Sequence, residues 1–256
     1  MISGNWILID ETKGATTTKG YKLTQKALRR IASAVSKQMN EEYAEEYGGT
    51  TQIRVARSKK DIRRGDWVFA IVDKFGGDDA DATAYHDITG KGVPVGFCAI
   101  STCDDLYGFD GVGADVSHEV LETAADIGAN IFAYNDDTGA FHCCEICDPV
   151  EMQTYGRKAA DGTVVQVSNF VLRSFYIPGH KGPYDYMTKA GRKGAVAPPG
   201  PFKTAKSKDD GNYQIIWTYK GEPQDATDYA KKIHGKRRKG DVHKVNRAAR
   251  RMRLDS

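Results

Sequence analysis

The sequence predicts an α+β fold, a mixed β-sheet with helices packed against it and a basic C-terminal extension. Three observations predict it: a strand–helix–strand order near the N-terminus, buried-type apolar strands in the middle, and a hairpin after a second helix. The composition, 40% hydrophobic and 28% charged, is that of a globular protein. A chain of 256 residues is long enough to bury a sizeable core.

The clearest predicted element is a helix from about Thr24 to Tyr47, which follows a short strand, NWILID, at 5–10. Thr24 is a suitable N-cap, and Gly48 with Gly49 ends the helix. Apolar residues recur along it at helical spacing: Leu28, Ile31, Val35 and Met39.

Strands and one further helix are predicted in the next part of the chain. Residues 51–58 alternate as a strand does, the segments around 65–74 and 93–102 are more buried strands, and a Gly- and Asp-rich loop separates these two. The second helix begins near Asp115 and ends between Asp126 and Gly128. The remaining predicted strands are 130–135 and 139–148, which form a hairpin around DDTG, then 162–172 and 212–220.

Charge separates the chain into a domain over 1–222 and a tail over 223–256. From Ala230 to Ser256 there are eleven Lys/Arg and two acidic residues, which leaves a net charge of −6 on the rest. Such basic density suits phosphate contacts with DNA, or contacts with other subunits; the alternative is a solvated, disordered extension. The predicted contact residues are Lys236, Arg237, Arg238, Lys239, Arg247, Arg250 and Arg251.

Cysteine usage and the N-terminal segment bear on the compartment. Five cysteines are an odd number, and the first residues lack a basic region followed by an apolar core. No stretch has the apolar length needed to span a bilayer. We therefore expect reduced thiols, no secretory signal and no membrane association.

The segment SHEVLETAAD at 117–126 differs by one residue from the zinc-protease signature HExxH. On a helix each residue turns about 100°, so His118 and Glu122 share one face and Glu119 lies beside them. His118 and Glu122 could hold a metal while Glu119 takes a proton from bound water. Glutamate in place of histidine favours harder ions, such as manganese or iron, over zinc. The alternative is a surface helix that matches by chance.

This segment, followed by EICDPVE, resembles a group of zincin-like proteins from phages and bacteria with SHELLE and E-x-CDPVE motifs. The resemblance extends to YHD at 85–87 and GVPVGF at 92–97, and covers roughly residues 65–220. It implies a zincin-like fold with a divalent metal, zinc first and manganese or iron as alternatives. His118, Glu122 and Glu145 are then the ligands and Glu119 the base.

Two aspartates extend this implied site. Asp126 continues the stripe of His118 and Glu122, and reaches the same metal if the helix unwinds before it, which Gly128 allows. By the resemblance, Asp148 is a ligand or a hydrogen-bonding partner of one. Glu145 lies 23 residues past Glu122, which is similar to the spacing in thermolysin-like enzymes.

The remaining candidates are a histidine and a Cys-x-x-Cys. We expect His86 to orient substrate or stabilise an oxyanion; equally, it could cap a turn. Cys144 and Cys147, with Cys103 and His142 as companions, lack the second pair that a zinc ribbon needs. On a strand, Cys143, Glu145 and Cys147 share one face. We therefore interpret these cysteines as small buried residues beside a ligand glutamate rather than as zinc ligands.

These observations predict a phage virion structural protein that carries a zincin-like metal-binding domain with residual peptidase activity. The alternative is an active metal-dependent peptidase with Glu119 as general base. Expected partners are other virion subunits in an oligomeric assembly, and DNA through the tail. The expected location is the host cytoplasm during assembly and then the virion.

Overall fold

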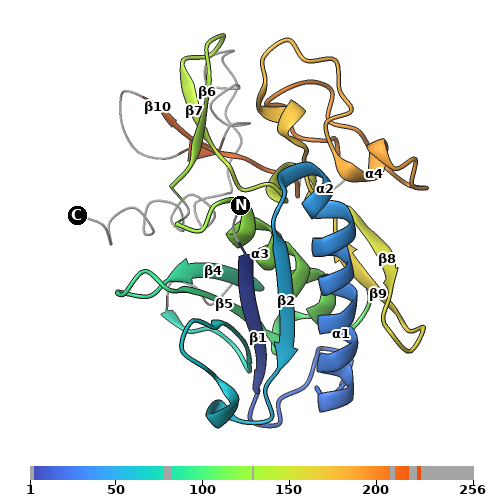
Figure 1. Cartoon of the computed structure of the whole chain (residues 1–256). Helices are drawn as coiled ribbons and strands as arrows, with labels where there is room; N and C mark the ends of the chain where they lie inside the picture. Colours follow the sequence, from blue (N-terminus) through green and yellow to red (C-terminus); the bar gives the residue numbers. More distant parts are fainter. Residues whose placement is uncertain (1–2, 78–81, 129, 208–210, 219–223, 226–256) are drawn as a thin grey trace. The chain divides into compact units, whose positions relative to one another are not determined.

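The computed structural model describes residues 3–77, 82–128, 130–207, 211–218 and 224–225 (Figure 1). The chain divides into two compact units, a first of Met1–Ile127 with Thr154–Ser168 and a second of Gly128–Gln153 with Asn169–Ser256. The predicted α+β class with a mixed sheet is confirmed. The division within residues 1–222 is not indicated by the sequence pattern. The basic contact residues predicted in the tail lie outside the described residues.

A five-stranded sheet in the order β2-β1-β3-β5-β4 is the centre of the first unit. Strands β2, β1, β3 and β5 run parallel, and β4 pairs antiparallel with β5 at one edge (Figure 1). The strands are β1 Ser3–Glu11, β2 Thr50–Val55, β3 Trp67–Val72, β4 Ala84–Ile88 and β5 Pro94–Ala99.

Both faces of the sheet are covered, as a largely parallel sheet requires. Consecutive residues Trp6, Ile7 and Leu8 of β1 are all 0% exposed, although their side chains point to opposite faces. Ile7 and Ile9 join one core cluster with Ala56 and Ala70. The predicted strand at 5–10 is therefore confirmed, and it lies inside the sheet between β2 and β3.

The first predicted helix is confirmed, with an interruption that the sequence does not indicate. It consists of α1 (Gln25–Gln38), a π-helical turn η1 (Met39–Tyr43) and α2 (Ala44–Tyr47). The Thr24 hydroxyl accepts a hydrogen bond from the Ala27 N–H at 3.1 Å, so it caps the helix as predicted. Gly48 ends the helix with φ of 77°, a backbone conformation that favours glycine.

The second helix, α3 (Val112–Ala125), begins three residues before the predicted start and contacts β4, β5 and β9. Strand β9 (Val164–Ser168) forms a hairpin with β8 (Thr154–Lys158). A Cβ on Gly113 would lie 2.4 Å from Val165 Cγ1, so the first turn of α3 approaches β9 more closely than any other residue allows.

Two strands of the first unit are missing from the sequence prediction. Strand β4 lies where we predict a Gly- and Asp-rich loop, and β8 has no predicted counterpart. The buried positions of β4 are Ala84 and His86, so its buried face lacks the large apolar residues by which a strand is recognised. Strand β4 is therefore identified by its antiparallel pairing with β5 and not by its own sequence pattern.

The second unit contains the predicted hairpin, β6 (Phe132–Asn135) with β7 (Ala140–Cys143). It belongs to a sheet in the order β11-β10-β7-β6, in which β10 is Ile215–Thr218 and β11 is Gln224–Asp225. The helix α4 spans Tyr186–Lys189. Short 3-10 turns of the two units are η2 Lys59–Asp61, η4 Ile100–Thr102, η5 Asp148–Val150 and η6 Arg173–Tyr176. Among the described helices, none is both long and apolar enough to cross a membrane.

Candidate metal and acid–base site

A buried hydrogen-bond network holds α3 at the residue before the HEVLE segment. The Ser117 hydroxyl donates to Gln38 Oε1 at 2.6 Å and accepts from the Ser168 N–H at 3.0 Å. The Gln38 side-chain amide donates to the Ser168 carbonyl at 2.7 Å. All three side chains are buried. Helix α3 is therefore tied to α1 and β9 directly beside His118.

His118 and Glu122 lie on one face of α3, as their spacing predicts. The His118 Nε2 and Glu122 Oε1 atoms are 3.3 Å apart, with side chains 14% and 4% exposed. Two ligands about 2.05 Å from one ion at a tetrahedral angle lie roughly 3.3 Å apart. The pair therefore has the separation that two ligands of a single metal need.

His86 connects β4 to the same helix. Its Nδ1 lies 2.7 Å from Glu119 Oε2 and 3.8 Å from Glu122 Oε2. A carboxylate only accepts hydrogen bonds, so an ionised Glu119 requires the proton on Nδ1 of His86. The carboxylate of Glu122 thus has one oxygen toward each histidine. His86 belongs to a strand, so the alternative in which it caps a turn is wrong.

Asp126 lies just beyond the end of α3. It is the C-cap residue, with φ of −142° and ψ of 85°, so the helix does unwind at this point as predicted. Its N–H donates to the Glu122 carbonyl at 2.8 Å, and the residue is 1% exposed. Among the described residues, Asp126 belongs to no group of three ligand-type side chains with ligand atoms within 4.8 Å of one another.

Glu145 and Asp148 belong to the second unit. Strand β7 ends at Cys143, so the prediction that Cys143, Glu145 and Cys147 share one face of a strand is wrong. The Glu145 carbonyl accepts a hydrogen bond from the Tyr176 hydroxyl at 3.4 Å. The Asp148 carbonyl accepts from the Tyr213 N–H at 3.1 Å. Their role as metal ligands stays a prediction.

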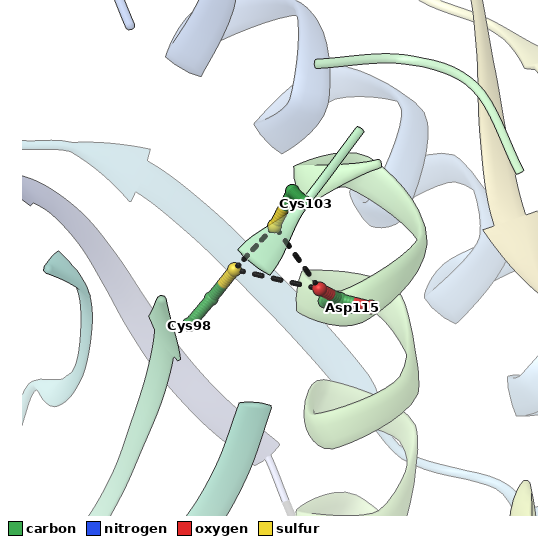
Figure 2. A group of neighbouring side chains, drawn as sticks. All are labelled: Cys98, Cys103 and Asp115. Atoms are coloured by element: carbon green, nitrogen blue, oxygen red, sulfur yellow. Dashed lines mark hydrogen bonds between the residues drawn. The ribbon is translucent and has the colours of Figure 1, made fainter. Parts of the chain in front are cut away.

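A second cluster in the first unit joins Cys98, Cys103 and Asp115 (Figure 2). The two Sγ atoms are 3.6 Å apart. Asp115 Oδ2 lies 3.6 Å from the Cys98 Sγ and 3.3 Å from the Cys103 Sγ. From the sequence, Cys103 is a candidate ligand only as a companion of Cys144 and Cys147, and neither Cys98 nor Asp115 is expected in a site.

Burial sets the protonation of this cluster. Burial raises the pKa of Asp115 to about 6, because it disfavours the charged carboxylate. The contact with Cys103, followed by burial, raises the pKa of the Cys98 thiol well above its ordinary value. The Cys98 contact lowers the pKa of Cys103, but burial and the nearby Asp115 outweigh it, so that pKa is also raised. With no cation present, both thiols are protonated at neutral pH.

The remaining thiols and His142 form no such cluster among the described residues. None of the five cysteines forms a disulfide bond. His142 Nδ1 lies 3.1 Å from Gln214 Oε1, and burial lowers the pKa of His142 to about 4. A zinc ribbon that includes His142 is not assembled by the residues that the structure describes.

Comparison with protein-family models, with curated proteins and with solved structures finds no match to this chain. The arrangement of side chains therefore carries the functional argument.

Proposed function

We propose that this protein has a zincin-like site in which His118 and Glu122 hold a divalent metal and Glu119 acts as general base in hydrolysis. One observation carries the proposal: the 3.3 Å separation of His118 Nε2 and Glu122 Oε1 on adjacent turns of α3. The donor set, one imidazole and one carboxylate, suits zinc, manganese or iron. Glu145 remains the further ligand predicted from the sequence.

The proton chemistry is assigned to Glu119 and His86. A bound divalent ion lowers the pKa of a water ligand and polarises a carbonyl group. Glu119 takes the proton of that water and passes it to the leaving group. The hydrogen bond from His86 Nδ1 to Glu119 Oε2, at 2.7 Å, fixes the orientation of the carboxylate. His86 is thus a positioning residue for the base in this proposal.

The proposal is tested by measuring metal content and hydrolytic activity together. Metal bound by the purified protein is quantified by mass spectrometry, and hydrolysis is followed with a fluorescently labelled casein. His118→Ala and Glu122→Ala should each lose one equivalent of bound metal and the hydrolysis. Glu119→Gln should keep the metal and lose the hydrolysis, because it removes the base but no ligand. Unchanged metal content in His118→Ala would sink the proposal.

A second candidate function follows from the charge of the chain. The segment from Ala230 to Ser256 carries a net charge of +9 while the rest carries −6. We propose, from this charge together with the resemblance to zincin-like phage proteins, that the protein is a phage virion component that contacts DNA or neighbouring subunits through its tail. Truncation after Tyr229 should reduce retention on immobilised DNA at low salt and leave metal content unchanged. Equal retention of both chains contradicts a DNA contact.

A further inference from the structure

We propose a second metal site, for zinc or a similar thiophilic divalent ion, formed by Cys98, Cys103 and Asp115 (Figure 2). Two thiolates and a carboxylate suit zinc, which takes sulfur and oxygen ligands in a tetrahedral arrangement. The site is separate from the proposed function, since it uses neither His118 nor Glu122.

The distances within the cluster match a tetrahedral zinc centre. With Zn–S of about 2.3 Å and Zn–O of about 2.05 Å, tetrahedral ligands lie roughly 3.8 Å apart for two sulfurs and 3.6 Å for sulfur and oxygen. The measured separations are 3.6 Å between the sulfurs, and 3.6 Å and 3.3 Å from the sulfurs to Asp115 Oδ2. The three atoms thus occupy one face of a coordination tetrahedron without rearrangement.

Short connections within the first unit hold the ligands in place. Cys98 is in β5, Cys103 follows the 3-10 turn η4, and Asp115 is in the first turn of α3. The Cys103 N–H donates to the Ile100 carbonyl at 3.2 Å, which fixes the turn between the two cysteines. Cys98 and Cys103 are buried, whereas Asp115 is only partly buried. In this proposal the metal enters from the side of Asp115, and a water molecule completes the coordination there.

Charge also favours a cation at this position. Among the ion pairs of the described residues, none joins Asp115 to a lysine or arginine. A carboxylate that is partly removed from water is stabilised by a nearby positive charge or by a proton. A divalent ion supplies that charge and deprotonates both thiols on binding.

A disulfide between Cys98 and Cys103 is the competing use of the cluster. The sulfurs are 3.6 Å apart, so they are in contact but not bonded, since a disulfide bond is about 2.05 Å long. Bond formation also requires an oxidant and a thiolate, and it gives Asp115 no role. The three-membered cluster is better explained by a metal.

Cobalt titration of the reduced full-length protein tests the proposal, because Co²⁺ replaces zinc and absorbs in the near ultraviolet only when thiolates bind it. Wild type should show this charge-transfer band, and added zinc should abolish it. Cys103→Ser and Asp115→Asn should lose or strongly weaken the band while circular dichroism confirms that they fold. His118→Ala should retain it, which distinguishes this site from the one proposed at α3.

Cys143→Ser is the matched control, since Cys143 is also buried but lies in the second unit. It should leave the cobalt band intact. A reduced wild-type protein without a thiolate band overturns the proposal, and so does an undiminished band in Cys103→Ser. A disulfide pair is identified instead by two results together. The thiols of Cys98 and Cys103 are then both lost in mass spectra of peroxide-treated protein, and the reduced protein shows no cobalt band.

Discussion

His86 on the edge strand β4 and Glu119 on helix α3 are joined by a hydrogen bond of 2.7 Å between Nδ1 and Oε2. Both side chains are buried, at 0% and 7% exposed. This hydrogen bond links the edge strand β4 to the HEVLE segment of helix α3. It also fixes the tautomer of the imidazole, because the carboxylate can only accept.

The first prediction separates the chemical role of Glu119 from its structural one. Glu119→Gln keeps an acceptor for His86 and should change the free energy of unfolding by less than about 1 kcal/mol, while hydrolysis falls by roughly 100-fold or more. Glu119→Leu removes the acceptor and should cost about 1–3 kcal/mol. Urea unfolding and the casein assay measure the two effects. Equal stability of the two variants would contradict a stabilising hydrogen bond between His86 and Glu119.

The second prediction concerns the network at Ser117. Ser117→Ala removes the donor to Gln38 and the acceptor of the Ser168 N–H, so it should destabilise the protein by about 2 kcal/mol. Ser33→Ala is the matched control, because Ser33 is also helical and accepts only an exposed bond from the Ala160 N–H.

The control should cost less than about 1 kcal/mol, and the gain in helix propensity is common to both variants. Chemical denaturation of the three proteins measures the difference. A cost at Ser33 as large as that at Ser117 shows that burial of the network is unimportant.

The third prediction tests the close approach of α3 to β9. Gly113→Ala places a Cβ 2.4 Å from Val165 Cγ1 and should destabilise the protein by about 1–3 kcal/mol, despite the better helix propensity of alanine. Gly90→Ala, with no heavy atom within 4 Å of its added Cβ, is the control and should be near neutral.

The double variant Gly113→Ala/Val165→Ala removes the atom that the new Cβ meets. It should therefore be less destabilised than the sum of the two single variants. Thermal and urea unfolding of the four proteins complete the cycle. Simple additivity would show that α3 shifts freely away from β9.

The fourth prediction follows from the buried His142, whose pKa burial lowers from 6.5 to about 4. The unfolded chain binds a proton at this residue between those pH values and the folded chain does not, so stability falls as the pH drops through this window. The loss attributable to His142 approaches about 3 kcal/mol at pH 4.

His142→Asn keeps a donor toward Gln214 and cannot titrate. Its free energy of unfolding should therefore decline less than that of wild type between pH 6.5 and pH 4. Urea unfolding at a series of pH values gives the comparison. Parallel curves for the two proteins contradict a buried neutral histidine.

The two long helices can be predicted from the sequence because their signals are local, whereas the short α4 is not predicted. Thr24 and Gly48 mark the ends of the first helix, and apolar residues at helical spacing between them are buried. The π-helical turn at Met39–Tyr43 has no such signal. Strand β4 was missed because alanine and histidine occupy its buried positions, so only pairing with β5 identifies it.

The sequence by itself determined that His118 and Glu122 face one way on α3, since helical geometry brings residues four apart onto one face. Only the tertiary structure decided that His86 meets Glu119, and that Cys98 and Asp115 are the partners of Cys103. These side chains come from different strands, turns and helices. Their contacts depend on how the sheet and helices of the first unit pack together, which the spacing of residues along the chain does not encode.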